Sequence, residues 1–484
     1  MASPARRPVV PWWAVVAVAA LVPAVALGAL AGYADSRTPP AVTATPTDTV
    51  PQQLPAVMTT PLLSVRRAPE ELAADRHRDL LTAAMAPLAG AIDGSSCLFV
   101  GLDDQQLLAR NADLPIIPAS NLKLVVAAVA LAVLGPGTTF TTTIVGPVPV
   151  DGVIDGDVYL VGGGDPVLSE PWYTQATSTR KRPPLHATDV GALAQALGAA
   201  GVTSITGKVI GDGSRYDDET HPPGWSNDIR ATADGVPVGA LVINDSITSS
   251  GSIAGNPTAS AAATFSAVLQ DHGVAVRGGS GTGTAPPGQA VLASVQSAPL
   301  TDLVNEMLAT SDNLTAEMMV KEIGLAAAQS GTRTAGLQAI TDRLASWGLD
   351  TAGLVLTDGS GLSHDNQLTC AVLAGVLQRG SATDAVGSGL ARGGQDGSTL
   401  ADAFQQEGLV GVLQGKTGTL HNPNEVKSLS GYFVTGADEV AFVLILNGSS
   451  ATAYTGAWDE LGAALLAAAA GPPADLLAPR VSVG

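Results

Sequence analysis

A serine and a lysine stand three residues apart at the start of an apolar run. The stretch PASNLKLVVAAVAL covers residues 118–131 and contains Ser120 and Lys123. On a helix, such a pair lies on one face, one turn apart, so the hydroxyl and the amine can touch. A lysine whose pKa is lowered by burial can take the proton of a serine and make it a nucleophile. The pair is a candidate for nucleophilic catalysis, although Ser120 could also simply begin a helix.

The spacing alone does not separate these two interpretations. Ser178 and Lys181, in STRK, have the same spacing and suggest no function. The residues RPP follow them at 182–184, and proline is excluded from a helix interior, so the geometry of that pair is not fixed. Evidence for catalysis at Ser120 must therefore come from elsewhere in the chain.

Two further clusters provide that evidence. SDN, from Ser311 to Asn313, lies between two segments with helical spacing of apolar residues, and KTGT, from Lys416 to Thr419, leads towards the last two β-rich runs. Ser-x-x-Lys, then Ser-x-Asn, then Lys-Thr-Gly is the order found in penicillin-recognising serine acyl transferases. Three matches in this order predict a serine acyl-transfer site.

With these motifs the sequence resembles the class C low-molecular-mass penicillin-binding proteins, which are D-alanyl-D-alanine carboxypeptidases and endopeptidases. GDVYLVGGGDPVL (156–168), DGSGLSHDN (358–366) and KTGTL followed by SLSGYF also resemble that family, and the resemblance covers most of residues 85–450. The 187 residues between Lys123 and Ser311 are similar to the family's habit of inserting extra domains there. A compact β-lactamase has no room for such an insertion.

The resemblance implies catalytic roles for three residues. Ser120 would be the nucleophile that forms an acyl-enzyme, Lys123 the general base, and Ser311 the relay of a proton to the leaving D-alanine amine. The backbone N–H groups of Ser120 and Thr419 would form the oxyanion hole, where charge develops only in the transition state.

The resemblance also implies a set of substrate-binding residues. Asn313 would hold an amide of the substrate, Lys416 would attract its terminal carboxylate, and Thr417 would donate a hydrogen bond to that carboxylate. Gly418 would leave room for the substrate along a strand edge. The implied substrates are peptidoglycan stem peptides ending in D-Ala-D-Ala, and β-lactams would be covalent inhibitors. The loop DGSGLS is interpreted as a structural turn near the site.

The same motifs also allow two other functions. A non-catalytic wall scaffold and a β-lactamase are the alternatives, and the fate of a covalent penicillin adduct separates them.

The acidic turns VIDGDV and IGDGSRYDDE lack calcium-loop spacing, so we expect no metal and no cofactor. Asp and Glu outnumber Lys and Arg by 43 to 24, a net charge of −19, which argues against binding nucleic acid.

The N-terminal segment predicts transport across a membrane. Trp12 to Gly32 contains no charged residue and follows Arg6 and Arg7, which is typical of a transmembrane helix with the rest of the chain outside the cytoplasm. ALA at 29–31 resembles a cleavage site, so a removed signal peptide is the alternative. Either way, the rest of the chain is expected at the outer face of the cell membrane or in the cell wall.

The order of the predicted elements indicates an α+β fold. β-rich runs at both ends with helices between them predict an antiparallel sheet covered by helices, and the block from about 146 to 289 predicts a β-rich insertion. The family resemblance implies that this sheet belongs to a penicillin-binding transpeptidase domain. Cys97 and Cys370 are either a disulfide or two buried thiols, and the extracytoplasmic setting favours the disulfide. The predicted segments are an anchor or signal peptide (1–34), a Pro/Thr-rich tether (35–69), the first catalytic segment (70–145), the insertion (146–289), the second catalytic segment (290–472) and a C-terminal tail (473–484).

Overall fold

The computed structural model describes residues 68–103, 105–175, 184–435 and 438–469. The predicted anchor or signal peptide, nearly all of the tether, the C-terminal tail, and Ser178 with Lys181 lie outside these residues. Within the described ranges, no helix is both long enough and apolar enough to span a membrane.

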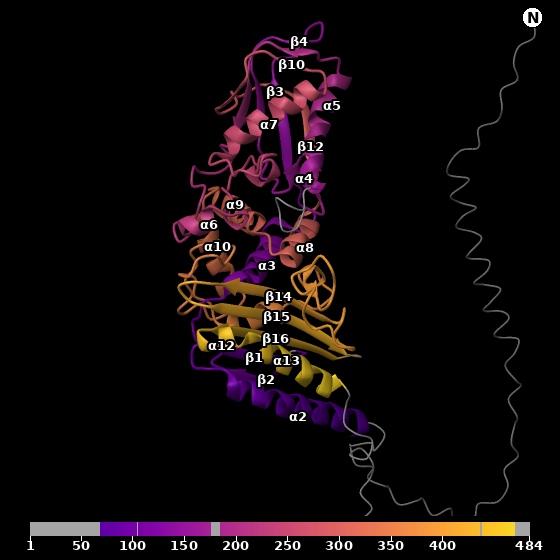
Figure 1. Cartoon of the computed structure of the whole chain (residues 1–484), viewed down its shortest axis with the longest axis vertical. Helices are drawn as coiled ribbons and strands as arrows, with labels where there is room; N and C mark the ends of the chain where they lie inside the picture. Colours follow the sequence, from indigo (N-terminus) through magenta and orange to yellow (C-terminus); the bar gives the residue numbers. More distant parts are fainter. Residues whose placement is uncertain (1–67, 104, 176–183, 436–437, 470–484) are drawn as a thin grey trace, which may run out of the picture. The chain divides into compact units, whose positions relative to one another are not determined.

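A six-stranded antiparallel sheet forms the centre of the catalytic region (Figure 1). Its order is β13-β14-β15-β16-β1-β2. The strands are β1 (Cys97–Leu102), β2 (Gln105–Arg110), β13 (Ala391–Arg392), β14 (Leu413–Leu420), β15 (Val426–Thr435) and β16 (Asp438–Asn447). Because β1 pairs with β16, the early and late segments of the chain meet in one sheet, as the sequence predicts.

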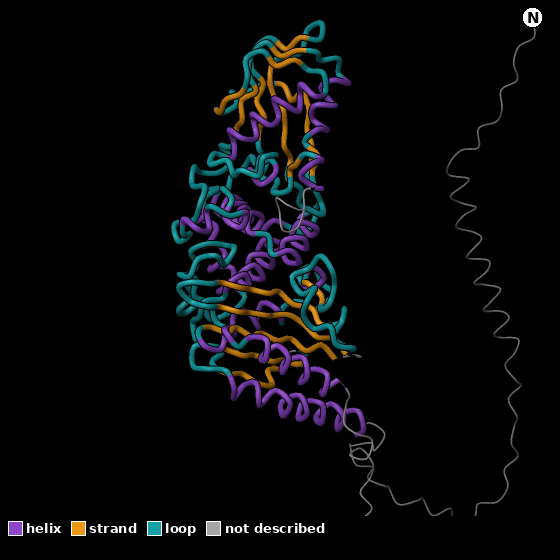
Figure 2. The backbone as a smooth tube through the Cα atoms, viewed as in Figure 1, coloured by secondary structure: helices purple, strands orange, loops and turns teal. Residues whose placement is uncertain are grey.

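Helices cover both faces of this sheet (Figure 2). Successive residues of a strand point to opposite faces, so Cys97 and Phe99 join one core while Leu98 and Val100 join the other. The second core is closed by α2 (Ala68–Ala91) and α13 (Tyr454–Ala469). The first is closed by α3 (Leu122–Leu134), α8 (Leu300–Thr310), α9 (Asn313–Ala328), α10 (Arg333–Ser346) and α11 (Cys370–Leu377).

The chain between α3 and α8 forms a second region with its own core. A five-stranded sheet has the order β11-β9-β5-β3-β12, and a three-stranded sheet has the order β10-β8-β4. The first contains β3 (Thr141–Gly146), β5 (Val158–Val161), β9 (Val209–Asp212), β11 (Ser280–Thr282) and β12 (Ala290–Gln296). The second contains β4 (Val153–Ile154), β8 (Ser204–Ile205) and β10 (Ala275–Val276). The main helices here are α5 (Gly191–Ala199) and α7 (Pro257–Asp271).

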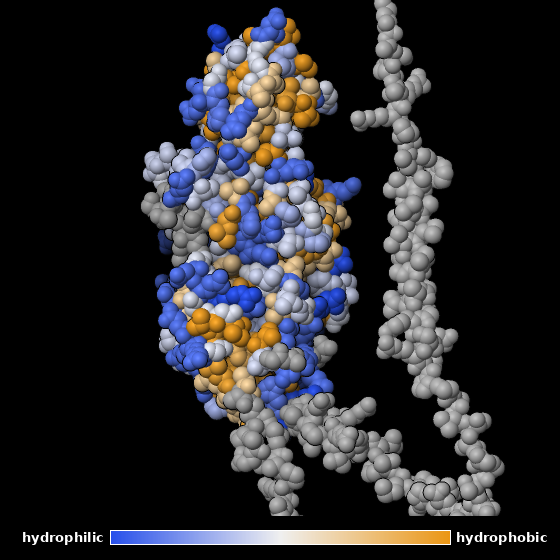
Figure 3. Space-filling model, turned by 90° about the vertical axis from the view of Figure 1, so that its right-hand side faces the viewer, coloured by the Kyte–Doolittle hydropathy of each residue, from blue (hydrophilic) through white to orange (hydrophobic). Residues whose placement is uncertain are grey.

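The pairing of β3 with β12 bears on the limits of this inserted region. The two strands are antiparallel neighbours over residues 141–146 and 290–296, so both belong to the sheet of the insertion. We therefore propose that the inserted region runs from 141 to 296, slightly wider than the 146–289 that the sequence suggests. Figure 3 shows hydrophobic residues interspersed with hydrophilic ones on the surface of the inserted region. Val148 and Val150, which lie between β3 and β4 in the chain, are exposed.

Ion pairs connect the inserted region to helices α9 and α10. Arg215 donates to the Glu322 carboxylate of α9 over 2.6 Å, and Lys321 of the same helix pairs with Asp217. A third pair joins Glu219 of the inserted region to α10, at its first residue, Arg333. We call these three ion pairs the junction.

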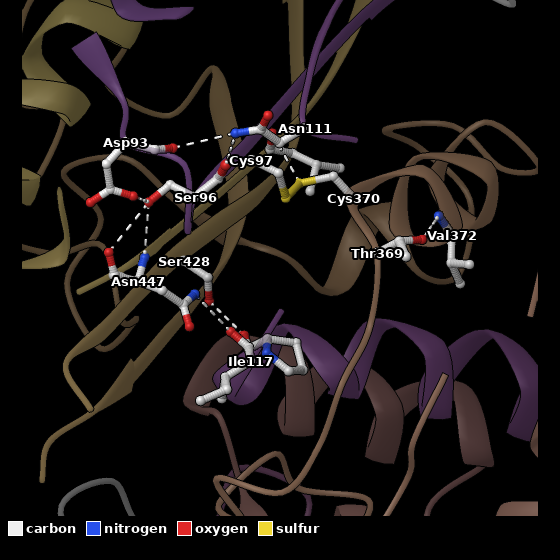
Figure 4. The surroundings of a disulfide bond; sticks show 12 residues. Asp93, Ser96, Cys97, Asn111, Ile117, Thr369, Cys370, Val372, Ser428 and Asn447 are labelled. Carbon is white, nitrogen blue, oxygen red and sulfur yellow. Dashed lines mark hydrogen bonds between the residues drawn. A yellow bond between two sulfur atoms is a disulfide. The ribbon is translucent and has the colours of Figure 1, made fainter. Parts of the chain in front are cut away.

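Cys97 and Cys370 form a disulfide, the state that the sequence analysis favours (Figure 4). The bond joins the first residue of β1 to the first residue of α11, across 273 residues of sequence. Close by, the side chain of Asn447, at the end of β16, donates to the Ile117 carbonyl over 3.2 Å. The end of the sheet is thereby tied to the segment that leads into Ser120.

Candidate active site

Ser120 lies in a short 3₁₀ turn, Ala119–Asn121, that precedes α3. The sequence run predicts a helix here, and the structure begins it with this 3₁₀ turn, whose first residue, Ala119, has a left-handed backbone with φ of 49°. The Asn121 side chain holds the turn on the sheet, donating to the Lys416 carbonyl over 2.9 Å and to the Ser428 hydroxyl over 2.7 Å. The turn is thus fixed against β14 and β15.

Lys123 is completely buried, and its amine meets three oxygens. Its Nζ lies 3.0 Å from Ser120 Oγ, 2.7 Å from Asn313 Oδ1 and 2.5 Å from the Ser360 carbonyl oxygen. The sequence analysis predicts the contact with Ser120 from helical spacing. The other two contacts come from segments about 190 and 237 residues away in the chain.

Burial changes the protonation of this lysine. The absence of solvent lowers the pKa of Lys123 to about 8, because water no longer stabilises the charged form. The carboxylates of Asp358, Glu317, Asp312 and Asp234 oppose this shift and raise the pKa. About a tenth of the amine is therefore uncharged at about pH 7, and this is the form that a general base requires.

Ser311 and Asn313 come from the point where two helices meet. Ser311 ends α8 in a left-handed conformation, with φ of 64°, and Asp312 begins α9 by accepting a hydrogen bond from the Thr315 N–H. Ser311 Oγ accepts from Lys416 Nζ over 2.8 Å. Asn313 Nδ2 donates to the Asp234 carbonyl over 2.9 Å, which leaves its oxygen to face Lys123.

One cleft of about 930 Å³ is lined by residues that include Ser120, Ser311, Asn313 and Thr417. Gly418 and Thr419 line it as well. β14 pairs with β13 only at Gln414 and Gly415, so among the described strands the edge of 416–420 is open to the cleft. An extended peptide can add to such an edge through main-chain hydrogen bonds.

Gly418 is needed for a reason that the sequence analysis does not give. A Cβ at this position would lie 2.2 Å from Ser428 Oγ and 2.9 Å from the Ser120 nitrogen. The first obstacle to a side chain is therefore the Ser428 hydroxyl of β15, and the second is the turn that carries Ser120. Gly418 allows that turn to approach the strand.

The arrangement has the components of a serine acyl-transfer site. The hydroxyls of Ser120 and Ser311 line one cleft. Behind them, the first contacts the buried Lys123 amine, whose pKa is lowered, and the second contacts the buried Lys416 amine. Within the described ranges, no group of three or more His, Cys, Asp or Glu side chains could hold a metal ion.

Several residues that build the site have no signal in the sequence. Asn121 and Ser428 fix the turn of Ser120, and the contributions of Ser360 and Asp234 are carbonyl oxygens. Every residue has a carbonyl, so residue type cannot reveal these two. Asn121 does lie inside the Ser-x-x-Lys match, but at a position where the pattern fixes no residue type, so the match does not indicate its role.

Comparisons with known proteins agree with this geometry. The model of the family "D-Ala-D-Ala carboxypeptidase 3 (S13)" matches residues 100–253 and 251–466. A D-alanyl-D-alanine carboxypeptidase of Actinomadura sp. (strain R39) is 31% identical, over 78% of this chain and 82% of its own. A carboxypeptidase of Mycobacterium tuberculosis is also 31% identical, over 72% and 74% of the two chains.

A solved structure supports the fold. The crystal structure of penicillin binding protein 4 from Haemophilus influenzae has a TM-score of 0.63 and is 20% identical, covering 75% of this chain and 93% of its own. At this identity the likeness supports the α+β architecture, while the family match supports the activity. The chain therefore belongs to the D-Ala-D-Ala carboxypeptidase 3 (S13) family and is a serine-type carboxypeptidase.

Proposed function

We propose that the protein removes the terminal D-alanine from peptidoglycan stem peptides through an acyl-enzyme on Ser120. The hydroxyl attacks the carbonyl of the D-Ala-D-Ala bond while the uncharged Lys123 amine takes its proton. Ser311 passes a proton to the amine of the leaving D-alanine. Water then attacks the ester, and the shortened peptide leaves. The observation that carries the proposal is the 3.0 Å contact between Ser120 Oγ and a completely buried Lys123 amine.

The residues around the cleft suit such a substrate. A stem peptide lying along the open edge of β14 would bring its terminal carboxylate towards Lys416 and Thr417, and an amide towards Asn313. The oxyanion would be stabilised by the backbone N–H groups of Ser120 and Thr419, which cost no reorganisation if they are fixed beforehand. The contacts of Asn121 with β14 and β15 hold the Ser120 turn in that position.

The same chemistry extends to two further ligand classes. A cross-linked peptide differs from the carboxypeptidase substrate only beyond the bond that breaks, so endopeptidase activity belongs to the proposal. A β-lactam carries a strained amide and a carboxylate in place of the peptide, and we propose that it acylates Ser120. A solved structure of the penicillin binding protein 4 of Haemophilus influenzae is a complex with a β-lactam.

The proposed substrate sets the cellular location. Peptidoglycan lies outside the cytoplasm, and the segment 12–32 has the composition of a membrane anchor or a signal peptide. We propose that this segment and the tether deliver the catalytic region to the outer face of the membrane or to the cell wall.

Release of D-alanine tests the proposal. The full chain is incubated with a muropeptide pentapeptide that ends in D-Ala-D-Ala, and free D-alanine is measured for the wild type, Ser120→Ala and Ser346→Ala. Ser346 is an exposed serine on α10 whose hydroxyl bonds only within its own helix among the described residues, so it is a matched control. We expect background release from Ser120→Ala and wild-type release from Ser346→Ala. Release from Ser120→Ala at the wild-type rate contradicts the proposal.

A further inference from the structure

The turn 358–361, with the sequence DGSG, is held by a buried carboxylate of α9. Glu317 Oε1 accepts from the backbone N–H of Gly359 over 3.0 Å and from that of Ser360 over 2.7 Å. Within the turn, Asp358 Oδ1 accepts from the Gly361 N–H over 2.8 Å. Glu317 is only 2% exposed, so these N–H donors replace the water that the carboxylate loses.

The turn is packed between the helix of Asn313 and the turn of Ser120. A Cβ on Gly359 would lie 2.4 Å from Val320 Cγ2 of α9, and a Cβ on Gly361 would lie 2.0 Å from the Ala119 carbonyl oxygen. Gly361 also has a φ of 80°, which favours glycine. The backbone of this turn therefore contacts both neighbours directly and cannot move without moving them.

The position of the Ser360 carbonyl determines where the Lys123 lone pair points. An uncharged amine has two N–H groups and one lone pair. The Ser360 carbonyl, at 2.5 Å, and Asn313 Oδ1, at 2.7 Å, can only accept hydrogen bonds and so take both N–H groups. The lone pair is left for the third neighbour, the Ser120 hydroxyl at 3.0 Å. This is the orientation in which the amine can receive the serine proton.

We propose that Glu317 is a positioning residue for acylation, acting through the Ser360 carbonyl to aim the Lys123 lone pair at Ser120. The proposal rests on the proposed function of Ser120 and Lys123. It concerns geometry. Burial, and then the charge of Asp358, raise the pKa of Glu317 to about 7, and above that pH its carboxylate favours the charged form of Lys123 and so works against the base. The benefit of Glu317 must then come from the turn that it holds.

Two substitutions separate the effect of the length of the Glu317 side chain from the effect of its charge. Glu317→Gln keeps the length of the side chain and one acceptor oxygen, which suffices for both N–H groups because Oε1 accepts both in the native protein. Glu317→Asp keeps the charge but withdraws the oxygens by one methylene group. The acylation of the full chain by a fluorescent penicillin is followed at several concentrations, which separates the binding constant K from the acylation rate constant k2.

We expect Glu317→Asp to lower k2 by about 10²-fold, the effect of misplacing a catalytic group by about 1 Å, with K changed less than about threefold. Glu317→Gln should retain k2 within about fivefold. It should also move the rise of k2 to lower pH, because one of the carboxylates that favour charged Lys123 is gone while Asp358, Asp312 and Asp234 remain. A k2 in Glu317→Asp within about threefold of wild type, or an equal loss in Glu317→Gln, overturns the proposal.

Glu322 provides the matched control on the same helix. Its carboxyl is also 2% exposed, but it accepts from Arg215 and from the Tyr216 hydroxyl at the junction rather than from the turn. Glu322→Gln should lower the melting temperature and leave k2 within about threefold of wild type. If Glu322→Gln lowers k2 as much as Glu317→Asp does, the effect is a general loosening of α9 and the proposal fails.

A second variant is used if Glu317→Asp does not fold, which is seen as the absence of a cooperative unfolding transition. Gly359→Ala displaces the same turn with Glu317 intact, and a wild-type k2 in that variant overturns the proposal. A wild-type protein that is not labelled at Ser120 overturns the proposed function as well. A labelled wild type together with an unimpaired Glu317→Asp overturns only the positioning role.

Discussion

One buried lysine lies at the junction and another lies behind the cleft, and their amines contact different kinds of group. At the junction, Lys321 is 3% exposed and pairs with the Asp217 carboxylate. Behind the cleft, Lys123 is fully buried, and its amine contacts a hydroxyl, an amide oxygen and a carbonyl oxygen. A direct carboxylate partner holds a lysine in its charged form, whereas neutral acceptors allow it to lose a proton.

We propose that this difference separates a structural lysine, Lys321, from a catalytic one, Lys123. Arg215 and Arg333 also meet carboxylates at the junction, so that region uses charge to connect the insertion to α9 and α10. The cleft keeps its carboxylates one layer away from Lys123, where Glu317 and Asp358 bind backbone N–H groups instead. Both lysines are buried, so depth of burial alone does not distinguish them, and the chemical nature of their nearest partners does.

The largest predicted effect comes from replacing each lysine by methionine. Lys123→Met removes the base, and we expect acylation by penicillin to fall by about 10³-fold, within the usual range for general-base catalysis. Lys321→Met should leave acylation within about threefold of wild type. It should lower the free energy of unfolding by about 2 kcal/mol, a discounted value because Asp217 is 35% exposed and regains water.

The two variants are compared by acylation rate and by urea unfolding. Equal losses of acylation in both, with equal losses of stability, would mean that the two lysines serve the same structural purpose. The distinction between the cleft and the junction would then be wrong.

The pH dependence of acylation is the next largest effect. Only the uncharged Lys123 amine accepts a proton, so the rate should rise with pH and level off above a pKa of about 8. Below this pKa we expect a loss of about tenfold for each pH unit. Acylation rates measured from about pH 6 to about pH 9.5 provide the test, and a rate that is constant across this range would contradict a lysine base.

The smallest predicted effect concerns a buried carboxyl in the inserted region. Burial raises the pKa of Asp165 to about 6, so the folded protein binds this proton more tightly than the unfolded chain does. Stability is therefore lost as pH rises from about 4 to about 6. Asp165→Asn cannot ionise and keeps the oxygen that accepts from the Val167 N–H.

We expect Asp165→Asn to increase the free energy of unfolding by about 1–3 kcal/mol at about pH 7.5 and to change it little at about pH 3.5. Urea unfolding at the two pH values measures both quantities. A variant that is destabilised at about pH 7.5 would show that the carboxylate has a favourable partner there. Acylation should be unchanged, because Asp165 does not line the cleft.

The sequence predicts the components of this site better than the way they are held together. The antiparallel sheet with its ends meeting, the helices on either side of SDN and the contact between Ser120 and Lys123 are all confirmed. Helical spacing and strand alternation act over a few residues, so they can be read locally. The roles of the individual residues remain predictions.

The remaining features depend on contacts between distant segments. The sequence indicates only a structural turn for the loop DGSGLS, but its Ser360 carbonyl contacts Lys123 itself. A backbone carbonyl leaves no trace in residue type, and glycines in a turn indicate only that the chain bends. The membership of β3 and β12 in the inserted sheet cannot be predicted for a similar reason, since β-rich runs do not indicate their partners.

The account depends on Ser120 being the residue that becomes acylated. The full chain is treated with penicillin and digested, and the modified peptide is identified by mass spectrometry. We predict one penicilloyl group per chain, on Ser120, and no adduct in Ser120→Ala. An adduct on another residue, or the absence of any adduct on the folded wild-type protein, would contradict the account.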